Sequence, residues 1–173
     1  MKIEEVKEKT EKRIFAIYDC FKSGYIEESL ILLYSTIDSI SWLYSNETNI
    51  DNRKPRHDFM KFSEEYYLPY LTGYDISAME LYLARCSVVH TSSSLAKKQN
   101  QNRQFQYSTS ENNRKVQDNI SKLVCNTCIS VNIKDLILAL KFSAEKFFNS
   151  LSINKIHEID TKTENWYVDC IIE

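Results

Sequence analysis

The chain has 173 residues, of which 43% are hydrophobic, and this is enough apolar surface for one domain, 1–173, with a buried core. Only two glycines and two prolines are present, which argues against sandwiches and barrels and favours a mainly α fold. The formal net charge of -2 excludes a globally basic surface for nucleic acid, so any RNA contact must be local.

The cysteines and the first residues indicate the compartment. Five cysteines are an odd number, and charges crowd the N-terminal residues where the apolar segment of a signal peptide would lie. We therefore expect reduced thiols and a cytoplasmic protein. The longest strongly apolar stretch, Leu30 to Leu33, is far shorter than the roughly 20 residues that cross a bilayer, so we expect no membrane partner.

Two long helices are predicted at the start of the chain. The first is charge-rich and runs from Ile3 to Phe21, with Gly24 as a suitable stop. The second runs from Ile26 to Tyr44, where aliphatic residues recur at helical spacing. A short connection at Gly24 predicts that they form an antiparallel hairpin.

Two further helices are predicted from their start signals. Asp58 is a reasonable N-cap for a short helix through Tyr67. Ser77 and Glu80 stand in the capping-box relation and predict a helix from about Ala78 to His90.

The remainder of the chain is expected to hold an insert and one last core helix. Residues 91–115 have few apolar anchors, which predicts a mobile polar excursion. Within it, Arg103 to Tyr107 alternates like a strand and could pair with Cys128 to Ile133 as a hairpin. Asn132 then opens a periodic helix through Leu151, and residues 152–173 form a C-terminal tail with a short element near Trp166 to Ile171.

The segment Arg85-Cys86-Ser87-Val88-Val89-His90 carries the strongest chemical signal. Cleavage of RNA without a metal needs an acid, a base and fixed positive charge on the phosphoryl oxygens. His90 can act as acid or base, and Arg85 can supply the charge. Five positions on an ideal helix turn through about 140°, so the pair meets one phosphate only if the helix ends at His90 or the arginine swings around the axis.

This R-x4-H pattern at the end of a late helix resembles the HEPN superfamily. The similarity extends to Gly24, to the aliphatic helix with Tyr34, Asp38 and Trp42, and to the segment from Tyr82 to Thr91, and it covers roughly Ile14 to Leu151. The resemblance implies an antiparallel bundle of four core helices with a small hairpin-like insert before the last one. It also implies a homodimer that cuts RNA in the cleft between its copies. Family members include toxins of toxin-antitoxin pairs and effectors of phage defence, and others are inactive scaffolds.

The resemblance assigns roles to individual residues. Arg85 matches the phosphate-stabilising arginine and His90 the acid/base, both as catalytic candidates. Asp38 is the candidate acidic residue on an earlier helix, where it either pairs with Arg85 or faces solvent. The supporting candidates in the same segment as the motif are Tyr82, Cys86 and Thr91. Cys86 stands where active members often have a polar Asn, and a thiol donates only weakly.

Two basic runs are the candidates for local RNA contact, with solvated loop charges as the alternative. Their members are Arg53, Lys54 and Arg56 in the first run, and Lys97, Lys98 and Arg103 in the second.

Cys125 and Cys128 have metal-ligand spacing, with His157 as a conceivable third ligand. A single CxxC is a weak signal, so we expect no metal and no cofactor.

The sequence therefore predicts a cytoplasmic, metal-independent endoribonuclease, either a toxin or a phage-defence effector, with RNA and an antitoxin protein as partners. One alternative is a catalytically inactive dimeric HEPN module that binds RNA, nucleotide or a partner protein. Another is a purely structural interaction domain.

Overall fold

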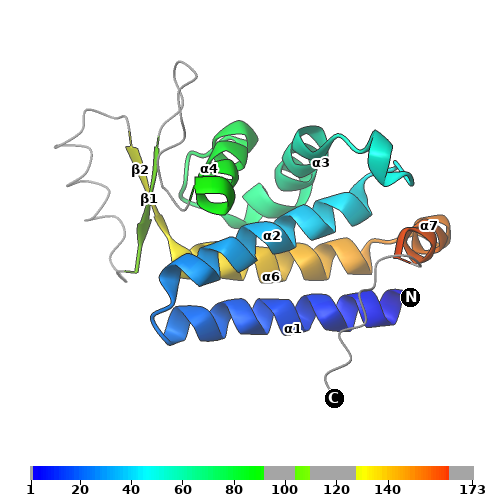
Figure 1. Cartoon of the computed structure of the whole chain (residues 1–173), viewed down its shortest axis with the longest axis horizontal. Helices are drawn as coiled ribbons and strands as arrows, with labels where there is room; N and C mark the ends of the chain where they lie inside the picture. The colour runs from blue at the N-terminus through cyan, green and yellow to red at the C-terminus, as the bar shows by residue number, and fades with distance from the viewer. Residues whose placement is uncertain (1, 92–103, 110–127, 164–173) are drawn as a thin grey trace.

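A computed structural model describes residues 2–91, 104–109 and 128–163 of the chain (Figure 1). The described part is mainly helical with a small two-stranded sheet, which confirms the predicted fold class at this level. Its helices and strands are α1 (Ile3–Lys22), α2 (Ile26–Tyr44), α3 (Pro55–Phe62), α4 (Ala78–Thr91), β1 (Gln104–Ser108), β2 (Cys128–Asn132), α6 (Ile133–Asn149) and α7 (Ile153–Thr163), with short helical turns at η1 (Ile50–Asn52), η2 (Ser63–Tyr67) and η3 (Leu68–Tyr70).

Helices α2 and α6 run through the middle of the molecule, α1 lies on one side, and α3 and α4 lie on the other (Figure 1). The two-stranded sheet stands at one end and α7 at the other (Figure 1). α2 contacts α1, α3, α4 and α6. No helix among the described residues is long and apolar enough to span a bilayer.

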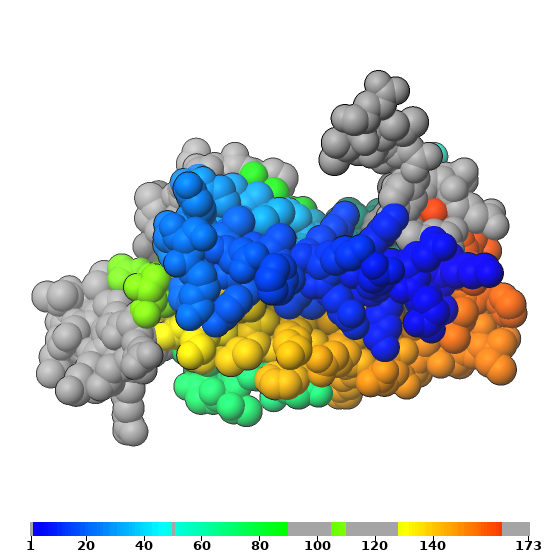
Figure 2. Space-filling model, turned by 90° about the horizontal axis from the view of Figure 1, so that it is seen from below, coloured from blue at the N-terminus to red at the C-terminus, as the bar shows by residue number. Residues whose placement is uncertain are grey.

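The hairpin of α1 and α2 is confirmed. α1 ends at Lys22, and Gly24 follows with a φ of 84°, in the left-handed region that glycine adopts without strain. α2 begins at Ile26 as expected and buries Leu33 and Ile37 completely. α1 covers the face of the molecule opposite α3 and α4, with α6 beside it (Figure 2).

The outer side of α1 and α6 is partly apolar. Residues of the two helices line a hollow of about 490 Å³. Two of the lining side chains, Phe15 and Leu138, are 66% and 42% exposed.

The predicted start of α3 is wrong. The helix begins at Pro55, three residues before Asp58, because proline suits the first helical position, where its missing N–H would have no partner. Asp58 lies within the first turn and its carboxylate faces Arg53 and His57 instead of capping the helix. The helix also ends at Phe62, and a single π-helical turn continues through Tyr67.

The capping box at the start of α4 is confirmed. The backbone N–H of Glu80 donates to Ser77 Oγ at 3.2 Å, and the Ser77 N–H donates to Glu80 Oε2 at 2.9 Å. These bonds satisfy donors that the first turn of a helix leaves without partners. They also fix the start of α4.

The predicted strand pair exists, but it is not a hairpin. β1 pairs with β2 in parallel, with Phe105 opposite Ile129. The intervening segment, 109–127, exceeds the dozen or so residues that a parallel crossover needs, so the chain can return to the same end of the sheet. Phe105 and Val131 are buried, and Tyr107 shares a hydrogen bond of 2.9 Å with Tyr34 of α2. The sheet is thus joined to the helical core.

The start of α6 is confirmed, since the Asn132 side chain accepts a hydrogen bond from Lys134 N at 2.8 Å. α7 was not predicted, because residues 152–173 were expected to form a tail. It buries Ile159 and Lys162 against the rest of the molecule. The element expected near Trp166 to Ile171 lies outside the described residues, as do 92–103 and 110–115 of the expected excursion.

Candidate functional site

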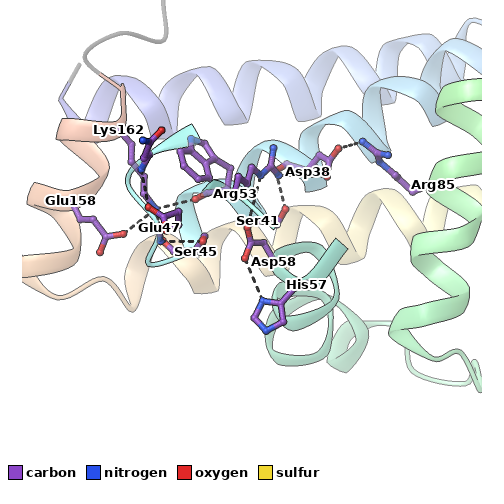
Figure 3. A network of polar contacts seen from close by, with 12 residues as sticks. Asp38, Ser41, Ser45, Glu47, Arg53, His57, Asp58, Arg85, Glu158 and Lys162 are labelled. Atoms are coloured by element: carbon purple, nitrogen blue, oxygen red, sulfur yellow. Dashed lines mark hydrogen bonds and ion pairs between the residues drawn. The ribbon is translucent and has the colours of Figure 1, made fainter. Parts of the chain in front are cut away.

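Asp38 and Arg85 meet between the two helices that carry the candidate motif residues. Arg85 projects from α4 and its Nη2 donates to Asp38 Oδ2 on α2 (Figure 3). Both side chains are mostly buried, with 16% of Asp38 and 15% of Arg85 exposed. Of the two alternatives for Asp38, the structure shows the pairing with Arg85. A bond of this kind restrains the arginine, because charge-assisted contacts are the stronger hydrogen bonds in proteins.

Arg53 approaches the same carboxylate from another direction. Its Nη2 lies 3.7 Å from Asp38 Oδ1 and donates to the Asp38 backbone oxygen at 3.0 Å. The Ser41 hydroxyl donates to that backbone oxygen as well, at 2.8 Å. Asp38 therefore lies between two guanidinium groups, one from α4 and one from the segment that precedes α3 (Figure 3).

A series of polar side-chain contacts continues from Arg53 to the surface. Arg53 Nε is 3.9 Å from Asp58 Oδ2, and Asp58 Oδ1 is 3.5 Å from His57 Nδ1. Asp58 is buried, whereas 57% of the His57 side chain is exposed. The series Arg85, Asp38, Arg53, Asp58 and His57 thus leads from the buried helix interface to solvent (Figure 3).

The environment of Arg85 keeps its charge. Burial alone would lower the pKa of the guanidinium, but the Asp38 carboxylate outweighs burial and the pKa is raised above its ordinary value. Tyr82, one turn before Cys86, has its pKa raised by burial and by a hydrogen bond with the Cys86 thiol. Its ring packs edge-on against Phe59 with centroids 5.7 Å apart. Two of the supporting candidates, Tyr82 and Cys86, therefore adjoin Arg85.

His90 and Thr91 belong to α4, and their side chains lie outside the described part of the structure. The helix continues through His90 to Thr91. It therefore does not end at His90, although an end there is one of the two arrangements that would let His90 and Arg85 meet the same phosphate. Arg85 also extends toward α2, where Asp38 holds it. Positions 85 and 90 are about 140° apart around a regular helix and therefore face different directions within a single chain.

The basic candidates of the first run differ in their surroundings. Lys54 and Arg56 line an open hollow of about 530 Å³ on α3, together with His57 and Lys61. Arg53 instead faces Asp38 and Asp58, and 18% of its side chain is exposed. The candidates of the second run, Lys97, Lys98 and Arg103, lie outside the described residues.

A second cluster of charges was not foreseen in the sequence. Lys162 of α7 is buried, donates to the backbone oxygens of Trp42 and Ser45, and pairs with Glu158 at 2.9 Å. Its Nζ lies 4.7 Å from the centre of the Trp42 ring, and the guanidinium carbon of Arg53 lies 5.5 Å from the same ring. Burial lowers the pKa of Lys162. No local pattern could reveal this cluster, because its members come from α2, α7 and the loop between α2 and α3.

The cysteine pair can be followed only in part. Cys128 is buried on β2 beside Gln106, Cys125 lies outside the described residues, and His157 is exposed on α7. In the ranges that the structure describes, no group of three or more His, Cys, Asp and Glu side chains is arranged to hold a metal ion.

No family model, curated protein or solved structure matches the chain. The guanidinium of Arg85 is mostly buried, permanently charged and restrained by a carboxylate, and it lies on a helix that also carries a histidine; this chemistry is suited to contact an anion.

Proposed function

We propose that the chain is a metal-independent endoribonuclease in which Arg85 stabilises charge on the phosphate and His90 acts as acid/base. The observation that carries this proposal is the ion pair of Arg85 with Asp38, which restrains a cation five residues before the histidine. A preorganised cation needs little rearrangement when charge develops on the phosphoryl oxygens.

The proposed reaction is an internal transesterification. The 2′-oxygen of a ribose attacks the adjacent phosphorus while a base takes its proton, and a P–O bond to the 2′-oxygen forms. The bond from phosphorus to the 5′-oxygen of the next nucleotide breaks, and an acid gives that oxygen a proton. The products are a 2′,3′-cyclic phosphate and a 5′-hydroxyl, with no oxidation or reduction. His90 supplies one of the two proton transfers.

We propose that two copies of the chain form the cleft. An α4 that continues past His90 turns that residue about 140° away from Arg85, so one phosphate meets both groups of a single copy only with difficulty. A two-fold axis beside α4 would bring Arg85 of one copy toward His90 of the other. Lys54 and Arg56, which line an open hollow, are candidates to contact the RNA backbone outside the cleft.

The HEPN resemblance alone supports a HEPN-type bundle of four core helices and a role as a toxin or phage-defence effector. The cytoplasmic location is proposed from the cysteines and the charged first residues. In the toxin case, an antitoxin protein would be the partner.

Purified protein incubated with end-labelled single-stranded RNA in EDTA tests the activity. We expect the wild type to cut, and His90→Ala and Arg85→Ala each to lose at least about 100-fold in rate, the loss typical of removing an acid/base group and a charge-stabilising donor, respectively. Arg13→Gln, an exposed arginine on α1, is the matched control and should cut at the wild-type rate. RNA left intact by the folded wild type would reject the proposal.

The second candidate is a catalytically inactive dimeric module that binds RNA, nucleotide or a partner protein. It is favoured by the same ion pair, because Arg85 already has an anionic partner and then serves to join α4 to α2. In that case wild type and His90→Ala would bind RNA equally and neither would cut it.

A further inference from the structure

Arg53 is enclosed on several sides although it lies in the segment that leads into α3. Its guanidinium contacts the Asp38 backbone oxygen at 3.0 Å, lies 3.7 Å from Asp38 Oδ1 and 3.9 Å from Asp58 Oδ2, and packs against the Trp42 ring. Three of these contacts involve α2, so Arg53 fixes the loop that follows α2 back onto that helix.

The two oxygens of the Asp38 carboxylate face different arginines. Oδ2 accepts from Arg85, and Oδ1 faces Arg53. At 3.7 Å the contact between Arg53 Nη2 and Oδ1 is an ion pair without a hydrogen bond, so Arg53 acts on Asp38 through its charge and through its hydrogen bond of 3.0 Å to the Asp38 backbone oxygen, which helps to fix the position of Asp38. The direction in which Arg85 is held therefore depends on Arg53.

Trp42 and α7 support Arg53 in turn. Trp42 is buried at 3% exposure, and Lys162 lies over its ring while donating to its backbone oxygen at 3.1 Å. Glu158 holds Lys162 at 2.9 Å. α7, far from α4 in the chain, thereby keeps in place the ring against which Arg53 packs.

We infer that Arg53 is a positioning residue for the proposed ribonuclease site, acting on Arg85 through Asp38. This inference rests on the proposed function for its kinetic consequence, but not for its structural one. The competing role is direct contact between Arg53 and RNA. Positioning is favoured because Arg53 lies between two carboxylates, 3.7 Å from Asp38 Oδ1 and 3.9 Å from Asp58 Oδ2, and donates its hydrogen bond to the Asp38 backbone oxygen.

The test uses Arg53→Gln and Arg53→Lys in the full chain, with Arg13→Gln as control. Arg13 donates to Ser39, the neighbour of Asp38 on α2, but it is exposed and touches neither Asp38 nor Arg85 in any contact found. We expect both Arg53 variants to lower kcat by about 10- to 100-fold with KM for RNA nearly unchanged. Arg53→Lys should not restore the wild-type kcat, because a single ammonium cannot replace the planar guanidinium and its several N–H donors. It retains the charge, so it also serves as the test variant if Arg53→Gln does not fold.

A spectroscopic readout separates this inference from the proposed function. Arg85 Nε is buried, and its N–H signal in a nitrogen-proton NMR spectrum can be assigned by its loss in Arg85→Lys. We expect this signal to shift or broaden in both Arg53 variants and to stay in place in Arg13→Gln.

The outcomes are distinguishable. If the wild type does not cut RNA but the Arg85 signal responds to Arg53, the ribonuclease proposal fails and the positioning inference is supported. If the wild type cuts RNA and the Arg53 variants change neither kcat nor the Arg85 signal, the positioning inference is overturned and the activity is retained. A raised KM with a weaker salt dependence and an unchanged signal would assign Arg53 to RNA contact and also overturn it.

Discussion

Arg85 of α4 and Asp38 of α2 form an ion pair across 47 positions of the chain, and Arg53 contacts the same aspartate. The pair connects the helix that carries the candidate motif to the central helix of the fold. Removing one member leaves the other charged in a site where only about a sixth of each side chain is exposed, as the values of 16% and 15% show.

Asp38→Asn should therefore lower the free energy of unfolding by roughly 2 to 4 kcal/mol, because it leaves both arginines without their shared carboxylate. Urea unfolding measures the change, with the exposed Asp51→Asn as a control expected within about 0.5 kcal/mol of the wild type. In the double variant Asp38→Asn/Arg85→Met, the loss in the free energy of unfolding should be smaller than the sum of the two single losses. Strictly additive losses would show that the two residues are not coupled.

Mixing two inactive variants tests the proposed sharing of the site. If Arg85 and His90 act from different copies, a mixture of Arg85→Ala and His90→Ala should regain a fraction of the wild-type RNA cleavage, because some mixed dimers hold one intact pair. Each variant alone stays inactive and serves as the control. The absence of any recovery, in a mixture shown by native mass spectrometry to exchange subunits, would place both groups in one copy.

The capping box of α4 should contribute to stability in a measurable way. Ser77→Ala removes the oxygen that accepts from Glu80 N, and we expect a loss of about 1 kcal/mol in the free energy of unfolding. Ser77→Thr, which keeps a hydroxyl that accepts from Glu80 N and donates to Glu80 Oε2, should lose less. Equal losses from both variants in thermal unfolding would argue against the cap.

Alkaline pH should weaken the fold through tyrosines whose pKa is raised, among them the half-buried Tyr44 and the buried Tyr34. Burial and a hydrogen bond to Glu65 raise the pKa of Tyr44 to about 12 from an ordinary value of 10. Since the folded state holds the proton more tightly, the stabilisation is complete below pH 10 and is lost as the pH rises toward 12. Burial raises the pKa of Tyr34 in the same direction.

Denaturant midpoints measured on either side of pH 10 check this expectation. Tyr44→Phe should lose less stability across that interval than the wild type does. The same loss in both proteins would exclude Tyr44 as a source of the pH dependence.

Local signals were sufficient for most helix boundaries. Gly24, the box of Ser77 and Glu80, and the cap at Asn132 each act through their own neighbours in the chain, and each was predicted from the sequence. The predicted cap at Asp58 is wrong because Pro55 takes the first helical position, which leaves Asp58 inside the first turn with its carboxylate toward Arg53 and His57. A residue type that often caps helices is also found in the first turn, so the residue type alone does not fix the boundary.

Long-range features could not be predicted in the same way. The parallel pairing of β1 and β2 depends on the path of the intervening chain, which strand periodicity does not encode. The sequence that forms α7 is polar at its start and predicts a tail, whereas the helix buries Ile159 and Lys162. The pairing of Asp38 with a cation was expected from the cost of burying a charge, but the second arginine was not, since loop residues carry no periodic signal.

The most direct test of the central claim is the chemical end group of RNA fragments made by the purified protein in EDTA. Mass spectrometry should find a 2′,3′-cyclic phosphate on the fragments from the wild type and no fragments above background from His90→Ala, with both proteins equally folded by circular dichroism. Fragments that form equally with His90→Ala, or that end in a 3′-hydroxyl, would contradict the proposed roles of Arg85 and His90.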